Sequence, residues 1–140
     1  MKVEHLNPPA LVKNPAFSQA IVVSGAHRTI WVGGQNAADG ATGRVIGAGD
    51  LRAQTRQVYA NLRVALAAAG AGLEDVVRWG VHVVHGHDPR PALEVSQAEW
   101  GRRPDPPTLT VLFVPALANP AFLIEIDAVA VRPDDSRGSA

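Results

Sequence analysis

Two acidic residues lie among strongly apolar neighbours near the C-terminal end of the sequence. Glu125 and Asp127 interrupt a run of β-branched and aromatic residues over 122–131 that is typical of a strand. Because successive strand side chains point to opposite faces, both acids lie opposite the face that carries Ile124 and Ile126. A carboxylate among buried strand residues costs several kcal/mol unless it is hydrogen-bonded or hydrated. We therefore interpret Glu125 as the first candidate for catalysis; the alternative is that both acids lie at a wet sheet face or a subunit seam.

Three histidines form a second group of reactive side chains, in the pattern His-x-x-His-x-His-Asp over 82–88. On an extended chain, residues two apart point the same way, so His85 and His87 could share a metal ion. Gly86 favours a turn between them, His82 belongs to the opposite register, and no cysteine is present to complete a zinc site. We interpret all three as loop histidines and expect neither a metal site nor a cofactor.

The composition restricts the classes of function. The chain has 140 residues, 46% of them hydrophobic, a formal net charge of zero and no cysteine. This length suits one domain with its own core, which we place at 1–132, followed by a disordered tail at 133–140. Thiol catalysis and disulfides are excluded, and nucleic-acid binding is not expected without a basic excess. No apolar run is long enough to cross a membrane and no signal-peptide core is present, so we expect a cytoplasmic protein without membrane contact.

Hydrophobic periodicity predicts two helices. Leu51–Ala69 carries apolar residues at helical spacing, with Asp50 as its N-cap and Gly70 as its stop. A shorter helix should begin after Asp88 and run to about Trp100. The remaining apolar runs predict strands. We expect a short strand near Val3–Leu6, a strand at Val76–Val84, and two hairpins, which join Ala20–Ser24 to Thr29–Gly33 and Thr108–Val114 to Phe122–Val131.

Two helices are too few to cover both faces of one sheet. An α+β fold with both helices on one face is therefore the natural packing. The other face would carry part of the set Trp31, Thr108, Thr110 and Glu125 and would need a partner. Exposed apolar faces seldom remain uncovered on monomers, so we expect the chain to associate with itself.

Five segments, taken together, resemble one known family. They are NPAFSQA at 14–20, VGGQ at 32–35, QT and NL within 54–62, LEDVV at 73–77 and IEIDAVAV at 124–131. The family is the Rid family (YjgF/RidA/L-PSP) of enamine/imine deaminases and their relatives, and the resemblance covers about residues 13–132. It implies a chorismate-mutase-like α+β protomer with a mixed sheet, assembled as a homotrimer with three small-molecule pockets at the subunit interfaces.

The resemblance also implies where a pocket would lie. Glu125 matches the acid associated with the attacking water, and it is the catalytic residue that we expect. Thr108 stands where members that hydrolyse 2-iminoacids carry an arginine, which grips the substrate carboxylate in a forked pair. The other expected substrate-binding positions are Phe17, which matches a tyrosine, Gly33, which replaces a serine, Gly34, which offers its backbone, and Thr110, which matches a small residue.

The missing arginine decides which substrate is expected. Hydrogen bonds to a charged group contribute roughly 1.5–3 kcal/mol each and a forked pair makes two, so carboxylate binding should weaken by a factor of hundreds or more. Arg102 and Arg103 lie just upstream of Thr108, but prolines separate them from it. They either substitute for the missing group or lie on a solvated loop.

These observations favour a Rid-like protein that hydrolyses an enamine or imine with release of ammonia, but not a standard 2-iminoacid deaminase. The alternative is a non-catalytic trimer whose interface pocket holds a small apolar or carbonyl compound. Endoribonuclease activity is a name also attached to the family. The neutral charge and the low aromatic content, 5% of residues, argue against it.

Overall fold

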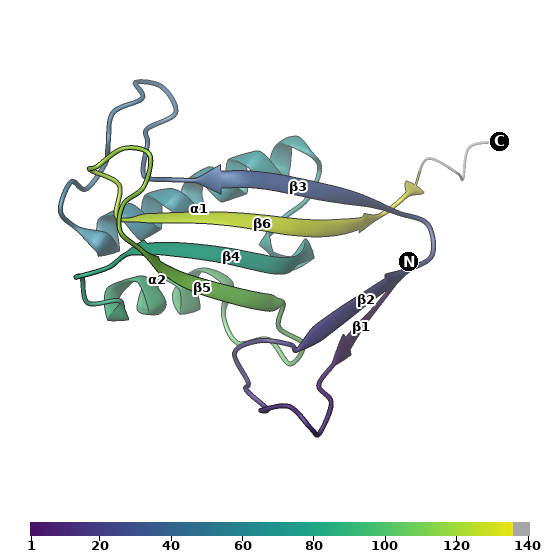
Figure 1. Cartoon of the computed structure of the whole chain (residues 1–140). Coiled ribbons are helices and arrows are strands. Elements are labelled where there is room, and N and C mark those ends of the chain that lie inside the picture. The colour runs from purple at the N-terminus through teal and green to yellow at the C-terminus, as the bar shows by residue number, and fades with distance from the viewer. Residues whose placement is uncertain (136–140) are drawn as a thin grey trace.

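Two helices cover one face of a four-stranded sheet, and no helix lies on the other face (Figure 1). The structure, a computed structural model, describes residues 1–135. A separate two-stranded sheet stands beside the larger one. In chain order the elements are β1 (Lys2–Leu6), β2 (Ala20–Ser24), β3 (His27–Gln35), α1 (Leu51–Ala68), a short 3₁₀ turn (Leu73–Asp75), β4 (Val76–Val84), α2 (Arg90–Trp100), β5 (Thr108–Val114) and β6 (Ile124–Pro133).

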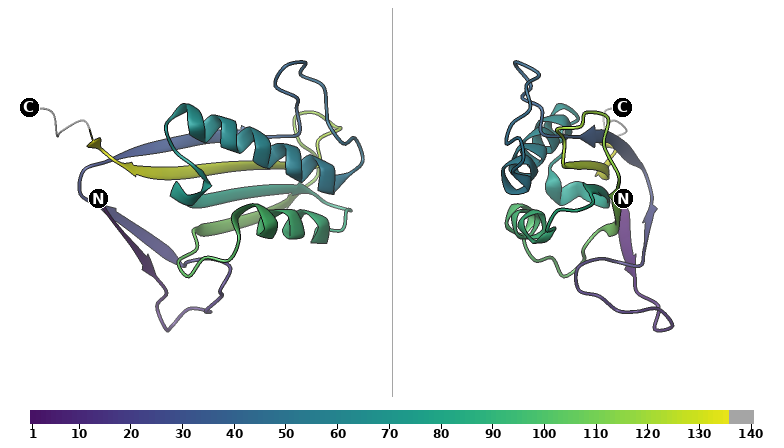
Figure 2. Two further views of the ribbon diagram at one scale, coloured as in Figure 1. Left: turned by 180° about the vertical axis from the view of Figure 1, so that it is seen from behind. Right: turned by 60° about the vertical axis from the view of Figure 1, so that its left-hand side comes forward.

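The larger sheet is mixed, with the strand order β3-β6-β4-β5. β4 and β5 run parallel and are joined by the crossover through α2, whereas β6 is antiparallel to both β3 and β4. Figure 2 shows from behind and from the side that α1 and α2 lie on the same face. The predicted α+β fold, with a mixed sheet and both helices on one face, is confirmed.

Both predicted hairpins are wrong, although the strands themselves are present. β4 lies between β5 and β6, because the α2 crossover places β5 on the free edge of β4. β2 pairs with β1, which confirms the short N-terminal strand, and β3 pairs with β6 instead. Gly25, at a φ of +80°, turns the chain out of the small sheet and into the large one. The alternation of apolar residues predicts strands, but their partners depend on contacts far apart in the sequence.

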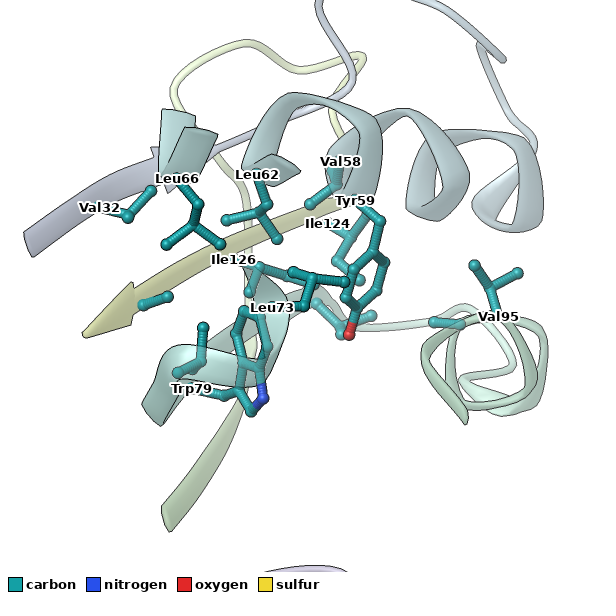
Figure 3. Packing of buried hydrophobic residues seen from close by; sticks show 14 of the residues in the cluster. Val32, Val58, Tyr59, Leu62, Leu66, Leu73, Trp79, Val95, Ile124 and Ile126 are labelled. Atoms are coloured by element: carbon teal, nitrogen blue, oxygen red, sulfur yellow. The ribbon is translucent and has the colours of Figure 1, made fainter. Parts of the chain in front are cut away.

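The apolar stripe of α1 forms the centre of the core. Asp50 caps the helix as predicted, since its side chain accepts a hydrogen bond from the Ala53 backbone N–H at 3.0 Å. Val58, Leu62 and Leu66 are fully buried against the sheet (Figure 3). Burying a side chain of this size stabilises the fold by roughly 1.5–3 kcal/mol.

The second helix completes the core at the β4–β5 side of the sheet. The Asp88 side chain accepts a hydrogen bond from the Arg90 backbone N–H at 3.0 Å, so the helix begins where the sequence predicted. Trp79 of β4 is buried and makes edge-to-face contacts with Tyr59 and Trp100, at centroid distances of 6.0 and 5.8 Å. Trp79 is therefore a core residue.

The C-terminal strand runs to Pro133, so the first residue of the predicted tail belongs to β6. The rest of that prediction falls largely on residues 136–140, which lie outside the described residues. Among residues 1–135, no helix has both the length and the apolar character that crossing a bilayer requires.

Candidate functional site

A large cavity lies on the helix face and not at the predicted site residues. It measures about 750 Å³ and lies between α2 and the strands β4 and β5. Its walls are mainly aliphatic and aromatic, with Trp79, Trp100 and Leu109 among them. None of the six predicted site residues lines it. The carboxylates of β6 and the histidine of β4 lie on the opposite face of the sheet.

We call that opposite face the open face. Strand alternation and register bring three rows of side chains together there. The first row is Thr108, Arg78, Val129 and Trp31; the second is Thr110, Gly80 and Asp127; the third is Leu112, His82 and Glu125. One face therefore combines four ionisable groups with exposed apolar surface. Trp31 shows this most clearly, because 78% of its surface is accessible.

Glu125 lies beside the backbone of β3 at a point where that strand is irregular. The register between β3 and β6 shifts between Val32 and Gln35, and Gly33 and Gly34 occupy the shift. A Cβ atom at Gly34 would stand 2.8–3.0 Å from the Glu125 side chain, so the carboxylate packs directly against the glycine backbone and would have to move to admit a larger residue. Within residues 1–135, the Glu125 carboxylate makes no hydrogen bond or ion pair with another side chain or backbone group. The structure thus brings together Glu125 and Gly34, two of the predicted site residues.

Thr108, Thr110 and Phe17 belong to a second group, away from Glu125. The strand β4 separates Thr108 and Thr110 from the strand that carries Glu125, which corresponds to a distance of roughly 9–10 Å. The segment of Phe17 is tied to the start of β5, because the Ser18 backbone N–H and hydroxyl donate to the carbonyls of Pro107 and Pro106 at 3.0 and 2.6 Å. Within one subunit the predicted site is therefore divided into two half-sites.

Thr108 makes only a weak substitute for an arginine. Its hydroxyl donates a hydrogen bond to the Val77 backbone carbonyl at 3.2 Å, which directs the group back to the sheet edge. Arg103 donates to the Glu74 carbonyl at 3.2 Å and stacks over Trp100 at 5.6 Å. Arg102 and Arg103 both line the cavity on the helix face, so neither replaces the missing guanidinium on the open face of the same subunit.

Three ionisable residues of the open face were not among the predicted site residues, although two of them, Asp127 and His82, were noted in the sequence. Arg78 pairs with Asp127 at 2.5 Å, and His82 Nδ1 lies 4.0 Å from the other Asp127 oxygen. The interpretation of His82 as a loop histidine is wrong, because it lies within β4 in register with Glu125. The signal was present in the predicted strand Val76–Val84, whose alternation places residues 78, 80 and 82 on one face.

No metal centre accompanies these groups. Among residues 1–135, no three side chains of His, Asp or Glu gather closely enough to hold an ion. His85 and His87 lie beyond the end of β4, in the connection to α2. The chemistry that the open face offers is that of carboxylates, an imidazole and hydroxyls.

Comparison with known proteins shows similarity along almost the entire chain. Residues 9–132 match the profile of a family described as endoribonuclease L-PSP. The RutC family protein PH0854 of Pyrococcus horikoshii is 34% identical over 116 residues, which cover 83% of this chain and 86% of that protein. Both helices and the strands of the open face lie inside the matched range.

Two solved structures show the same similarity in three dimensions. The protein YyfB of Yersinia pestis, a member of the conserved Rid family whose function is unknown, has 37% identity and a TM-score of 0.76, with 93% of this chain and 98% of that chain covered. Rv2704 of Mycobacterium tuberculosis, from the YjgF/YER057c/UK114 family, has 32% identity and a TM-score of 0.58, with coverage of 81% and 85%.

Proposed function

This chain belongs to the Rid (YjgF/L-PSP) family, as its sequence segments predicted, and on that premise we propose that it hydrolyses the C=N bond of a small imine or enamine and releases ammonia. Glu125 is the base that activates the attacking water. The observation that carries this proposal is the position of Glu125 on the open face, against the Gly34 backbone and without a partner among residues 1–135. A carboxylate that the fold does not use for its own contacts is available for chemistry.

The working unit of the proposal is a homotrimer with one pocket at each subunit interface. Glu125 with Gly34 and Thr108 with Thr110 form half-sites on different strands, too far apart to grip one small molecule within a subunit. Contact between open faces of neighbouring subunits would join unlike half-sites. The same contact would cover Trp31 and Leu112, which are 78% and 49% exposed in the single subunit.

The substrate of the proposal lacks a carboxylate beside the C=N bond. Thr108 supplies no positive charge, and the positive charge of Arg78 on the same face is neutralised by Asp127. An imine derived from a simple ketone or aldehyde fits such a pocket better than an imine derived from an amino acid. The net charge of the sequence, zero, offers equally little support for binding a polyanion such as RNA.

The alternative function is binding without catalysis. It draws support from the same departures from the family pattern, because Phe17 offers a ring without a hydroxyl and Thr108 directs its hydroxyl at the Val77 carbonyl. A pocket with few groups to grip a substrate would suit a small apolar or carbonyl compound. The two functions differ in whether bound imine is turned over.

Measuring ammonia release from two probe compounds distinguishes hydrolysis from binding without catalysis. Benzophenone imine has no carboxylate, whereas 2-iminopropionate, generated in the assay by an amino-acid oxidase, carries one. We expect the wild-type protein to hydrolyse the first and to have weak or no activity on the second. Comparable rates on both would contradict the substrate proposal. Binding of benzophenone imine without ammonia release would establish the non-catalytic alternative.

A substitution at position 108 tests whether the missing arginine explains the expected weak activity on 2-iminopropionate. Thr108→Arg should raise kcat/KM for 2-iminopropionate by roughly 10²-fold, because a forked pair adds two charge-assisted hydrogen bonds. Thr108→Lys is the matched control, since it adds the charge without the fork and should gain less. Equal gains in both variants would show that charge alone matters, and no gain in either would place the pocket elsewhere.

A further inference from the structure

His82 is the only ionisable residue directly opposite Glu125 in the register of the described sheet. It pairs with Glu125 on β6 and with Leu112 on β5. Side chains in directly opposite positions have their Cβ atoms roughly 4.5–5.5 Å apart. A ligand that reaches the Glu125 carboxylate therefore also meets the imidazole. His82 has 31% of its side chain exposed, so it borders the open face without being free in solvent.

The two nitrogens of the His82 ring have different surroundings. Nδ1 is buried and has no hydrogen-bond partner in the described structure. An Asp127 carboxylate oxygen lies 4.0 Å from it. A rotation that closes this gap by about 1 Å would form a charge-assisted hydrogen bond between Nδ1–H and the Asp127 carboxylate. Nε2 is then the nitrogen that faces a ligand.

Asp127 is held in place for this contact from two sides. Its other oxygen pairs with Arg78 Nη1 at 2.5 Å. Gly80 lies between Arg78 and His82 on the same face of β4, and a Cβ atom there would overlap the Asp127 carboxylate. The glycine thus leaves the space that the carboxylate occupies between the guanidinium and the imidazole. This arrangement sets an arginine, an aspartate and a histidine in a line that ends beside Glu125.

We propose that His82 is the second acid–base group of the site, with Asp127 and Arg78 as the residues that position it. This inference rests on the proposed C=N hydrolysis. A carboxylate bound to Nδ1–H fixes the ring in the tautomer and orientation in which Nε2 exchanges protons with the substrate, as in other histidine–carboxylate pairs. Glu125 exchanges protons with the attacking water, and His82 exchanges protons with the imine nitrogen in the addition step.

The two groups complete the reaction without any further reactant. Glu125 accepts a proton from water as the water oxygen bonds to the imine carbon. The π pair of the C=N bond moves to nitrogen, which takes a proton from Nε2 of the imidazolium form of His82 to give a neutral carbinolamine, and His82 is left neutral with its proton on Nδ1. Glu125 then returns its proton to the amine nitrogen, and His82 accepts the hydroxyl proton as the C–N bond breaks. Carbonyl product and ammonia leave, and both side chains regain their starting protonation.

The first test needs no substrate. Nitrogen NMR of histidine-labelled protein reports which ring nitrogen of neutral His82 carries the proton, with the signal assigned by its loss in His82→Gln. We expect the Nδ1–H tautomer in the wild type and a shift towards Nε2–H in Asp127→Asn, which weakens the acceptor. The charged groups around His82 on the described strands are Glu125, Asp127 and Arg78, and the facing strand β5 contributes none there. An Nε2–H tautomer in the wild type overturns the inference.

The second test is kinetic and uses benzophenone imine. His82→Gln keeps a hydrogen-bonding side chain, but an amide does not act as an acid or a base near neutral pH, so kcat should fall by roughly 10²-fold or more. The kcat of Asp127→Asn should lie between that of the wild type and that of His82→Gln. His82→Gln should also alter the dependence of kcat on pH, and added imidazole should partly restore the activity of His82→Ala. A histidine that merely fills space would produce neither the altered pH profile nor the rescue.

The exposed His87, in the connection after β4, provides the matched control. His87→Gln should retain wild-type rates and the wild-type pH profile. Equal behaviour of His82→Gln and His87→Gln in a protein that hydrolyses the imine would overturn the role of His82 and leave the proposed function standing. If the imine is not hydrolysed, the proposed function fails; the tautomer measurement then decides whether Asp127 positions His82.

Discussion

The two faces of the sheet differ in how far their polar side chains are hydrogen-bonded within the protein. On the helix face, the fully buried Gln54 donates to the Ala121 carbonyl at 2.8 Å and accepts from the Leu123 N–H at 2.8 Å, so its polarity serves the fold. On the open face, Glu125 has no partner among residues 1–135, and His82 Nδ1 is buried without one. Buried polar groups are usually satisfied within a protein. On the helix face, Trp79 Nε1 also lacks a partner among residues 1–135, but Glu125 and His82, which can exchange protons, both lie on the open face. The open face is therefore the better candidate for acid–base chemistry.

The largest expected effect is the loss of stability when a buried side chain on the helix face is truncated. Leu62 is fully buried, and Leu62→Ala should lower the free energy of unfolding by about 2–5 kcal/mol because it leaves a cavity in the core. Val64 lies on the same helix but is 71% exposed, so Val64→Ala should change stability by less than about 0.5 kcal/mol. Urea titrations of both variants check this. Similar losses in the two would mean that α1 does not bury the face described.

A smaller effect is expected on the open face, and it should concern assembly. Trp31→Ala removes a large exposed side chain from β3, and we expect weaker subunit association by about 2 kcal/mol, roughly 30-fold in the dissociation constant. Light scattering over a range of concentrations measures it, with Val64→Ala as the exposed apolar control. Unchanged assembly in Trp31→Ala would show that subunits meet through another surface.

The smallest effect is a pH dependence on the helix face. Burial raises the pKa of Tyr59 from 10.0 to about 12, and a hydrogen bond from Ser96 opposes the shift only partly. The neutral phenol is therefore favoured in the folded state. Its contribution to stability is complete below pH 10 and is lost as the pH rises from 10 towards 12.

The matched variant for this pH dependence is Tyr59→Phe. Between pH 9 and pH 11 the wild type should lose about 1.4 kcal/mol more of its free energy of unfolding than Tyr59→Phe, which has no phenol to ionise. Denaturant titrations at the two pH values measure the difference. Parallel losses in the two proteins would show that Tyr59 is open to solvent and that the core near α2 is looser than described.

The sequence predicted the helix face better than the open face, and the reason is physical. Burial leaves a periodic pattern, so α1, β4 and the stripe of Val58, Leu62 and Leu66 could be placed before the structure was known. The pairing of strands leaves no such pattern. The crossover that separates β5 from β6 follows from packing α2 on the sheet, so both hairpins were predicted wrongly.

The candidate site was predictable only in part for a related reason. Glu125 was evident because an acid in an apolar strand is costly. The structure places it against Gly34, and its role as a site residue stays a prediction. His82 was hidden in a histidine-rich segment that suggested a loop, and its meaning depends on the register that sets it opposite Glu125. Asp127 stood out beside Glu125 for the same reason, but its pairing with Arg78 across β4 and β6 could not be read from the sequence.

The most direct test of the account is one substitution with two readouts. Glu125→Gln keeps the shape of the side chain and removes its charge, and no partner within residues 1–135 is left without its counterion. We expect ammonia release from benzophenone imine to fall by roughly 10²–10⁴-fold. We expect the melting temperature of the assembled protein to stay close to that of the wild type. A large drop in melting temperature with hydrolysis intact would contradict the account, because it would show that Glu125 serves the fold and not the chemistry.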